Sequence, residues 1–134
     1  MTPVAADVPK SIDLPTIVLV LRDDGLLVAT NKPGTVQTLE DARENVEGTR
    51  SLGLGRRPPL LVDMRESRGM ERAARAYYAG PEGEKVVCAI GLLVGSPATR
   101  IIGNFFIGLN RVLVPCKLFS DEEDAVAWLR GFLP

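Results

Sequence analysis

The sequence predicts one α/β domain with a mostly parallel sheet. Two observations carry this prediction: apolar, β-branched runs alternate with segments of helical periodicity, and an Asp-Gly turn separates the first two runs. The expected order is ββαβαβαβα, in which crossover helices join parallel strands and the first strand makes an antiparallel edge. We expect residues 14–134 to form this domain. Residues 1–13 are small, polar and proline-containing, and we expect them to form a flexible N-terminal arm.

The first half of the domain opens with a hairpin. Residues 16–21 (TIVLVL) and 26–30 (LLVAT) are apolar runs, and the turn RDDG at residues 22–25 joins them. A helix is expected from Thr38 to about Ser51, because Thr38 can cap it and acidic residues follow in its first turn. Its apolar stripe is thin, so we expect this helix to lie shallowly on the core with most of its surface in solvent.

The second half continues the alternation of strands and helices. A short strand is expected at residues 60–63 (LLVD), followed by a helix that starts at Met70 and stops at Gly80. Residues 86–94 (VVCAIGLLV) show no alternation, which is typical of a central strand covered on both faces. The order is completed by a helix at 97–110 capped by Ser96, a strand within 112–119, and a helix opened by the capping box SDEE at 120–123.

The composition excludes several classes of protein. With no histidine, the usual zinc ligand sets and histidine-dependent catalytic groups cannot form, and the two cysteines have no CxxC neighbour; we expect no metal and no cofactor. A net charge of -1 gives no overall attraction to nucleic acid. The longest apolar stretch, residues 86–94, is too short to span a membrane, and the N-terminus lacks a basic segment before an apolar block. We therefore expect a cytoplasmic protein.

The element order and the segment from Leu60 to Gly69 resemble the STAS domain of bacterial anti-anti-sigma factors, the SpoIIAA-like fold. In that family a strand ends near an acidic residue, and a loop similar to Asp-Ser-Ser-Gly opens the next helix. The first serine of that loop is the phosphate acceptor, and Ser67 is the matching position here. Glu66 stands in place of the family's aspartate, and Arg68 in place of the second serine.

The later part of the chain is more similar to uncharacterised bacterial members of this fold. The residues that carry this similarity are 95–97 (GSP), 102–106 (IGNFF) and 119–129. Those members have no assigned activity, so the resemblance implies the fold more than a particular function.

Ser67 is the candidate phosphorylation site. We expect it at or just before a helix N-terminus, where free N–H groups and the helix dipole favour an added phosphate. The alternative is that Ser67 simply caps or precedes that helix.

Charged residues around Ser67 are candidates for binding an anion or an acidic partner. They are Asp63, Arg65, Arg68, Arg72 and Arg75. A solvated face joined by ion pairs is the alternative for the arginines. Asp63 lies where ligands bind in open parallel sheets, at the carboxyl end of a strand, but it could equally pair with Arg65 or Arg100.

The helix at 97–110 supplies a candidate dimer surface. At about 100° per residue, a helical wheel turns one apolar arc toward the core, formed by Ile101, Ile102, Phe105, Phe106 and Leu109. On the other side, Gly103 and Gly108 flank Ile107, an arrangement that suits close approach of a second subunit or an apolar ligand. Packing within the core is the alternative.

Taken together, these features predict a non-catalytic binding or regulatory domain that contacts a protein partner through the Ser67 loop. One alternative is a protein that binds an anion, or a small apolar ligand in a cavity between the sheet and the helix at 97–110. A second is a small enzyme that uses Asp63, Ser67 or Cys116, of which Cys116 is expected to be the more accessible cysteine.

Overall fold

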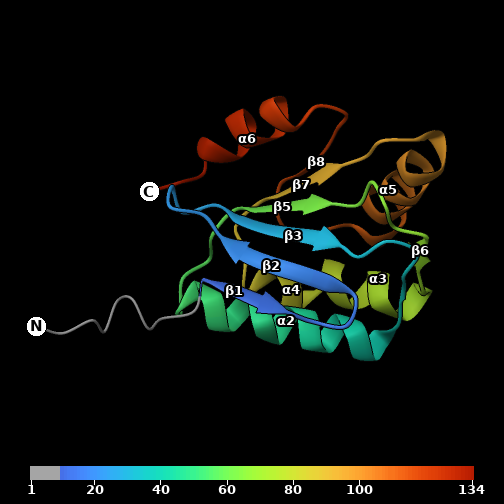
Figure 1. Cartoon of the computed structure of the whole chain (residues 1–134), viewed down its shortest axis with the longest axis horizontal. Helices are drawn as coiled ribbons and strands as arrows, with labels where there is room; N and C mark the ends of the chain where they lie inside the picture. The colour runs from blue at the N-terminus through green and yellow to red at the C-terminus, as the bar shows by residue number, and fades with distance from the viewer. Residues whose placement is uncertain (1–9) are drawn as a thin grey trace, which may run out of the picture.

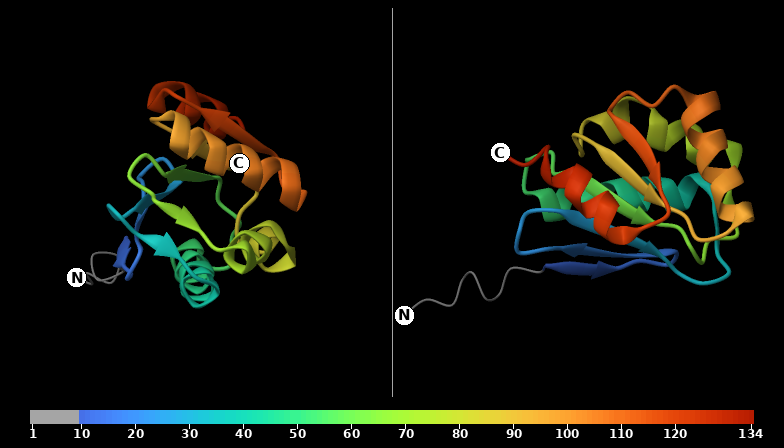
Figure 2. Two further views of the ribbon diagram at one scale, coloured as in Figure 1. Left: turned by 90° about the vertical axis from the view of Figure 1, so that its right-hand side faces the viewer. Right: turned by 90° about the horizontal axis from the view of Figure 1, so that it is seen from above.

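A six-stranded sheet with helices on both faces forms the centre of the structure (Figures 1 and 2). The computed structural model describes residues 10–134, except for the side chains of residues 105, 109 and 110. In spatial order the strands are β1 (Ser11–Asp13), β2 (Ile17–Leu21), β3 (Leu27–Asn31), β5 (Leu60–Asp63), β7 (Ile90–Leu93) and β8 (Cys116–Phe119). Pairing is antiparallel from β1 to β3 and parallel from β3 to β8, which confirms the predicted α/β class.

The helices form two unequal layers. Four of them pack on one face of the sheet, namely α2 (Leu39–Gly53), α3 (Arg72–Ala79), α4 (Pro81–Glu84) and α5 (Pro97–Asn110). On the opposite face lies α6 (Glu122–Arg130), where Leu129 packs against Leu61 and Leu93 (Figure 1). Because successive strand residues point to opposite faces, Leu61 contacts α6 whereas Leu60 and Val62 face the larger helical layer.

Strand β7 is buried on both faces, as its uninterrupted apolar sequence predicts. All four of its residues are buried. Ile90 and Leu92 pack with the larger helical layer, and Leu93 packs with α6. Gly91 also faces α6, where a Cβ would lie 3.1 Å from the Leu129 side chain, so this position favours a glycine. The strand is shorter than the predicted 86–94, but it lies inside the sheet, between β5 and β8, and is covered on both faces as predicted.

A second, two-stranded parallel sheet lies beside the first. It pairs β4 (Val36–Gln37) with β6 (Gly69–Met70). Gly69 has a φ of +138°, a backbone conformation that a side chain would strain. Strands of two residues carry no readable periodicity, which is why neither was predicted. This small sheet ties the segment before α2 to the segment before α3.

One boundary and the depth of one helix differ from the prediction. Residues 11–13, assigned to the N-terminal arm, form β1, because their backbone pairs with β2 and Ile12 packs beside the hydrophobic cluster of Ile17 and Leu19. The rest of the predicted arm, residues 1–9, lies outside the described residues. Helix α2 begins after its cap Thr38 as predicted. It does not lie shallowly, however, since Val46, Leu52 and the polar Asn45 and Thr49 are all buried.

Helix α5 is rotated relative to the predicted wheel. Ile101, expected in the core, is 55% exposed, whereas Gly103 is buried. A Cβ on Gly103 would lie 2.5 Å from the Leu118 side chain, so the missing side chain lets the helix approach β8. Ile107 is half-buried against the core cluster of Phe106, and only Gly108 faces open space. Gly103, Ile107 and Gly108 therefore do not form one exposed dimer surface.

The close approach of α4 to α3 gives a test of the fold by substitution. A Cβ on Gly83 would lie 2.0 Å from the backbone oxygen of Tyr78, so Gly83→Ala must push the two helices apart. We expect a loss of about 1–3 kcal/mol in the free energy of unfolding, measured by urea denaturation. Gly108→Ala is the matched control: nothing lies within 4 Å of its Cβ position, so alanine should stabilise by about 0.5–1 kcal/mol. Equal midpoints for Gly83→Ala and the wild type would contradict this packing.

Candidate functional site

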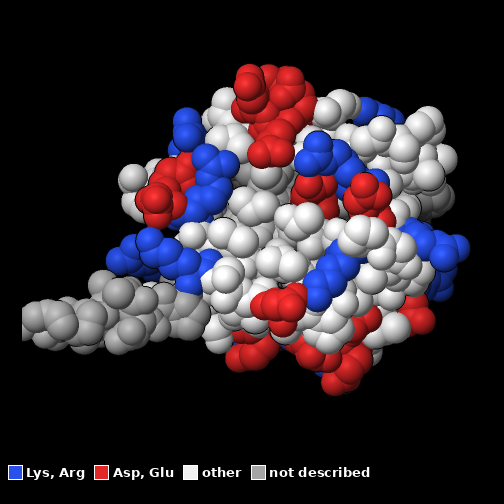
Figure 3. Space-filling model, viewed as in Figure 1, with Lys and Arg blue, Asp and Glu red and all other residues white. Residues whose placement is uncertain are grey.

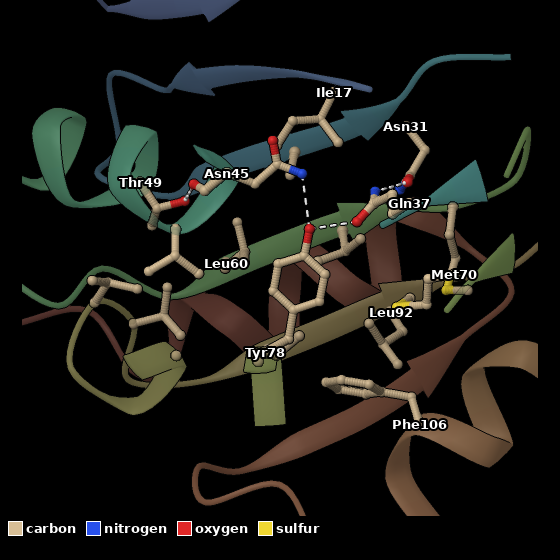
Figure 4. A pocket seen from close by; sticks show the side chains of 18 residues that line it. Ile17, Asn31, Gln37, Asn45, Thr49, Leu60, Met70, Tyr78, Leu92 and Phe106 are labelled. Carbon is tan, nitrogen blue, oxygen red and sulfur yellow. Dashed lines mark hydrogen bonds between the residues drawn. The ribbon is translucent and has the colours of Figure 1, made fainter. Parts of the chain in front are cut away.

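A cavity of about 80 Å³ lies between the sheet and the larger helical layer (Figure 4). This volume is close to that of two or three water molecules in the liquid. Most of its lining is apolar and comes from both layers, including Ile17, Leu60, Val62, Leu92 and Phe106. Gly83 and Val87, from α4 and the segment after it, complete one wall. The arrangement offers an apolar group a site between the sheet and the helices.

Polar side chains cross this apolar cavity as a continuous chain of hydrogen bonds. The Asn31 amide nitrogen donates to the backbone oxygen of Asp63 over 3.1 Å. The Gln37 amide nitrogen donates to Asn31 Oδ1 over 2.6 Å. The Tyr78 hydroxyl donates to Gln37 Oε1 and accepts from the Asn45 amide nitrogen, the latter over 2.8 Å. Figure 4 shows these side chains meeting across the cavity. We call Asn31, Gln37, Tyr78 and Asn45 the polar relay.

Each member of the relay is positioned by a different element. Asn31 ends β3, Gln37 lies in β4, Asn45 lies on α2 and Tyr78 lies on α3. The pairing of β4 with β6 fixes Gln37, whose backbone oxygen also accepts from Glu71 N over 2.8 Å. The relay therefore joins the main sheet, the small sheet and two helices at one point.

Asn45 ends the relay with an unpaired acceptor. Only 3% of this residue is exposed, and its Oδ1 atom is buried with no hydrogen-bond partner. The amide nitrogen is fully used, because it contacts Thr16 Oγ1 at 3.3 Å as well as Tyr78. Thr49 lies one turn on, but its hydroxyl donates to the Asn45 backbone oxygen over 2.8 Å. A buried acceptor without a donor is costly, by about 1–3 kcal/mol.

The electrostatics of the cavity are those of a neutral site. Among the lining residues that the structure describes, none is Asp, Glu, Lys or Arg. Burial raises the pKa of Tyr78, the hydrogen bond from Asn45 only partly offsets this rise, and the charge of Asp41 adds to it. The hydroxyl is therefore protonated at neutral pH and keeps its role as donor to Gln37.

Asp63 takes part in the relay through its backbone, while its carboxylate pairs with Arg65. Arg65 Nη2 lies 2.7 Å from Asp63 Oδ2, and Arg65 Nε donates to Asp63 Oδ1 over 2.9 Å. Burial alone would raise the pKa of Asp63, but hydrogen bonds from the Arg65 side chain and backbone, together with its charge, outweigh burial and lower it. Arg100, the other predicted partner, contacts Ser120 instead. Asp63 thus forms an ion pair with Arg65, which the sequence analysis gave as the alternative to a role in binding a ligand.

Two of the four candidate arginines are held by groups of the domain itself. Arg65 is paired with Asp63, and Arg75 Nη1 donates to the Met70 backbone oxygen over 2.9 Å. Arg68 and Arg72 are exposed and form no ion pair within residues 10–134. Figure 3 shows basic and acidic side chains interspersed over one face of the molecule. The ion-paired alternative therefore holds for Arg65, and Arg68 and Arg72 stay candidates for binding an anion or an acidic partner.

Ser67 lies in a loop and does not start a helix. Its hydroxyl accepts from Gly69 N over 3.1 Å, and its own N–H donates to the Met64 oxygen over 3.1 Å. Strand β6 follows, and α3 begins only at Arg72 with Glu71 at the N-cap. The prediction of a serine at the helix N-terminus is therefore wrong, because Arg68, the two residues of β6 and the cap Glu71 intervene. The half-buried Ser67 side chain instead closes a tight turn.

Cys116 is not the accessible thiol that its sequence position predicted. Burial raises its pKa to about 12, and burial also raises the pKa of Cys88. The registers of β7 with its neighbours align Cys116 with Leu60, at the other end of β5 from Asp63. Across the described residues, no group of three Cys, Asp or Glu side chains is arranged to hold a metal.

Comparisons with known proteins agree with this fold. An uncharacterised protein of the DUF3478 family from Shewanella loihica PV-4, with a SpoIIAA-like fold, superimposes with a TM-score of 0.63. It is 20% identical, over 90% of this chain and 99% of that chain. This likeness confirms the predicted SpoIIAA-like architecture.

The chain belongs to the family described as a domain of unknown function (DUF7793), whose model matches residues 19–133. A protein of unknown function from Arthrobacter sp. FB24 is 38% identical, over 83% of this chain and 90% of that chain, with a TM-score of 0.34. Curated protein sequences give no significant match. Within residues 10–134, no helix combines the length and apolar character needed to cross a membrane.

The sequence analysis did not predict the polar relay. Asn45 and Thr49 offered a signal, because they follow Ala42 at spacings of three and seven residues and so share its helical stripe with Val46. A polar residue on a buried stripe indicates an internal hydrogen bond. Gln37 and Tyr78 offered no comparable signal, because their positions depend on contacts between elements far apart in the chain.

Tyr78→Phe tests the relay by removing one oxygen. The change leaves Gln37 Oε1 without its donor and Asn45 Nδ2 without one acceptor, so we expect a loss of about 1–3 kcal/mol in the free energy of unfolding by urea denaturation. Tyr77→Phe is the control on the same helix, since the Tyr77 hydroxyl makes no hydrogen bond within the described residues; it should change stability by less than about 0.5 kcal/mol. Equal losses in the two variants would contradict the relay.

Proposed function

We propose that this domain is a non-catalytic binding protein that holds a small, uncharged and mainly apolar molecule, or the apolar end of a larger one, in its cavity. One observation carries the proposal: a cavity of about 80 Å³ lies between the sheet and the larger helical layer, its lining is mainly apolar, and the residues of the polar relay stand among its lining residues. Binding sites for small molecules commonly combine an apolar lining with a few fixed polar groups.

The energetic cost of these features supports a binding role. At about 24 cal/mol per Å³, an empty cavity of this size costs about 2 kcal/mol. The unpaired Asn45 acceptor adds a further loss of about 1–3 kcal/mol. A larger apolar side chain in the wall would remove the first cost, and an apolar residue at position 45 would remove the second. A bound apolar molecule would fill the cavity and offset the first of these costs.

The chemistry of the lining supports binding over catalysis. Catalysis by nucleophilic attack or proton transfer needs a group that changes protonation near neutral pH or is activated by a neighbour. Tyr78 is the lining residue with an ionisable side chain among those described, and burial raises its pKa. The sequence candidates for an enzyme do not meet at the cavity either, since Asp63, Ser67 and Cys116 do not line it.

Xenon is a suitable probe of the cavity because it enters small apolar cavities without needing a hydrogen bond. Under xenon pressure, methyl NMR signals of Val62, Val87 and Leu92 should shift, whereas those of Val126 and Leu133, which pack on the α6 face, should not. Val87→Phe should abolish the shifts by filling the cavity, and Val126→Phe should preserve them. Unshifted lining methyls in the wild type would refute the binding proposal.

A second candidate function follows from the contacts of the Ser67 loop, residues 64–68. The loop is attached at both ends to cavity-lining residues: Asn31 holds the Asp63 oxygen before it, and β6 pairs with β4 after it. Arg68 N also donates to the Thr35 oxygen over 3.0 Å. Arg65, Glu66 and Arg68 are exposed along the loop. We propose that a protein partner contacts this loop and thereby detects whether the cavity is filled.

Hydrogen exchange tests the link between the cavity and the loop. Saturating the cavity with xenon should slow exchange of the amides of Arg68 and Glu71, whose acceptors are the oxygens of Thr35 and Gln37. Amides of α6 should exchange at an unchanged rate, because that helix lies on the other face of the sheet. Unchanged exchange at Arg68 and Glu71, with the lining methyls shifted, would remove the loop from the proposal while leaving the cavity as a binding site.

A further inference from the structure

We infer that an uncovered part of the main sheet binds a second copy of this chain, with the strands of the two copies antiparallel. This interaction surface goes beyond the proposed function of the cavity, and it differs from the surface on α5 that the sequence predicted. It lies on β1, β2 and β3, on the face of the sheet that also carries α6.

Strands β1 and β2, and part of β3, have a helix on one face only among the described elements. Ile17, Leu19 and Leu27 are buried on the face that α2 covers, and the residues between them point the other way. On that other face, α6 packs on β5, β7 and β8. The strand registers place six residues together beside α6, namely Ser11, Asp13, Val18, Val20, Val28 and Thr30. We call these residues the open sheet face.

The centre of the open sheet face is apolar. Val20 is 39% exposed and lies directly opposite Val28 on the neighbouring strand, and Val18 beside them is half-buried. Valines on adjacent strands give one continuous apolar strip rather than scattered exposed side chains. Figure 3 shows an uncharged area in the middle of this side of the molecule, with acidic and basic side chains around it. An apolar centre with a polar rim is typical of a surface that binds another protein.

The two ends of the open sheet face carry opposite net charges. The ion-paired residues near the turn between β2 and β3 are three bases and two acids, a net charge of +1: Lys10, Arg22, Arg130, Asp23 and Asp24. Those at the opposite end are two bases and three acids, a net charge of -1: Lys32, Arg65, Asp13, Asp63 and Glu122. The first turn of α6 adds the acids Glu123 and Asp124 next to Glu122.

This charge distribution favours a second copy over a partner that carries one sign of charge. A uniformly acidic or basic partner would be repelled at one of the two ends. A twofold axis that lies in the interface and crosses the strands places the basic end of each copy over the acidic end of the other. Sheets pack face to face in such an arrangement, and the side chains of the two inner faces interdigitate.

The shape of the molecule leaves room for this contact. Both views in Figure 2 show β1 and β2 standing further out on this side than α6, so α6 does not hold the two copies apart. Two strands of five residues beside one of three cover an area of about 10 Å by 17 Å. A stable interface covers about 800 Å² on each partner, so the charged ends must supply the rest of the contact. We therefore expect a weak dimer that dissociates on dilution.

Sedimentation equilibrium of the whole chain tests the dimer. The mean mass should rise from 14.5 kDa toward twice that value as the protein concentration is raised from about 10 µM to about 1 mM. Val20→Glu places a charge in the apolar centre and should keep the mass at that of the monomer. Val36, an exposed valine in the small sheet, supplies the matched control, and Val36→Glu should dimerise like the wild type. A wild-type protein that stays monomeric at about 1 mM would overturn the inference, and so would a Val20→Glu variant that dimerises normally.

Charge reversal tests the antiparallel arrangement. Lys10 and Asp13 lie at opposite ends of β1, so the Lys10 end of one copy lies over the Asp13 end of the other. Lys10→Glu and Asp13→Lys should each raise the dissociation constant of the dimer about twofold to tenfold, because each change acts twice in a twofold dimer. The double variant should return toward the wild-type value. A double variant that dimerises no better than the single variants would overturn this arrangement.

Two further points complete the test. Lys10 and Asp13 are exposed, so their variants keep the inference testable if circular dichroism shows that Val20→Glu does not fold. Ile101→Glu examines the exposed apolar residue of α5, on the other side of the sheet, and should dimerise like the wild type. Loss of the dimer in Ile101→Glu, with normal dimerisation of Val20→Glu, would assign the interface to α5 and overturn the inference.

Discussion

The hydrogen bond from Asn31 to the backbone oxygen of Asp63 determines how the interior of this domain is arranged. It joins the ends of β3 and β5, which are neighbours in the parallel part of the sheet. From this contact the relay extends through Gln37 in the small sheet to Tyr78 on α3 and Asn45 on α2. Polar groups in a low-dielectric interior must pair with the correct partner, so one fixed carbonyl orients the whole series. The shape of the cavity is thus set by its apolar side chains. Its polar groups are oriented by the backbone oxygen of Asp63 at the end of β5.

The order of the main elements could be predicted from sequence because each carries a local signal. The hairpin has its Asp-Gly turn, α2 and α5 have the caps Thr38 and Ser96, and β7 has an uninterrupted apolar run. These signals depend on residues close together in the chain. Secondary structure and the α/β class follow from them without knowledge of tertiary contacts.

The features that failed prediction depend on contacts between distant elements. A helical wheel finds an apolar arc but not the depth of each residue, and Gly103 enters the core because it has no side chain to hold α5 away from Leu118. Ser67 does not start a helix because the two-residue strand β6 follows it. The partner of β6 is β4, which lies more than thirty positions earlier in the chain. The relay was not predicted for both reasons. It needs the depth of residues on α2 and α3, and it needs the short strand β4 placed beside the end of β3. The fold shared with a 20% identical protein fixes none of these side chains, so the function had to be argued from the cavity itself.

The two edge strands of the main sheet affect how readily the protein aggregates at high concentration. Exposed strand edges can pair with other chains and start aggregation. Among the described strands, the edges are β1, with three residues, and β8, with four. Both carry a charged side chain, Asp13 on β1 and the exposed Lys117 on β8. Short, charged edges offer few backbone groups to a foreign strand, so the sheet is protected against growing beyond its own six strands.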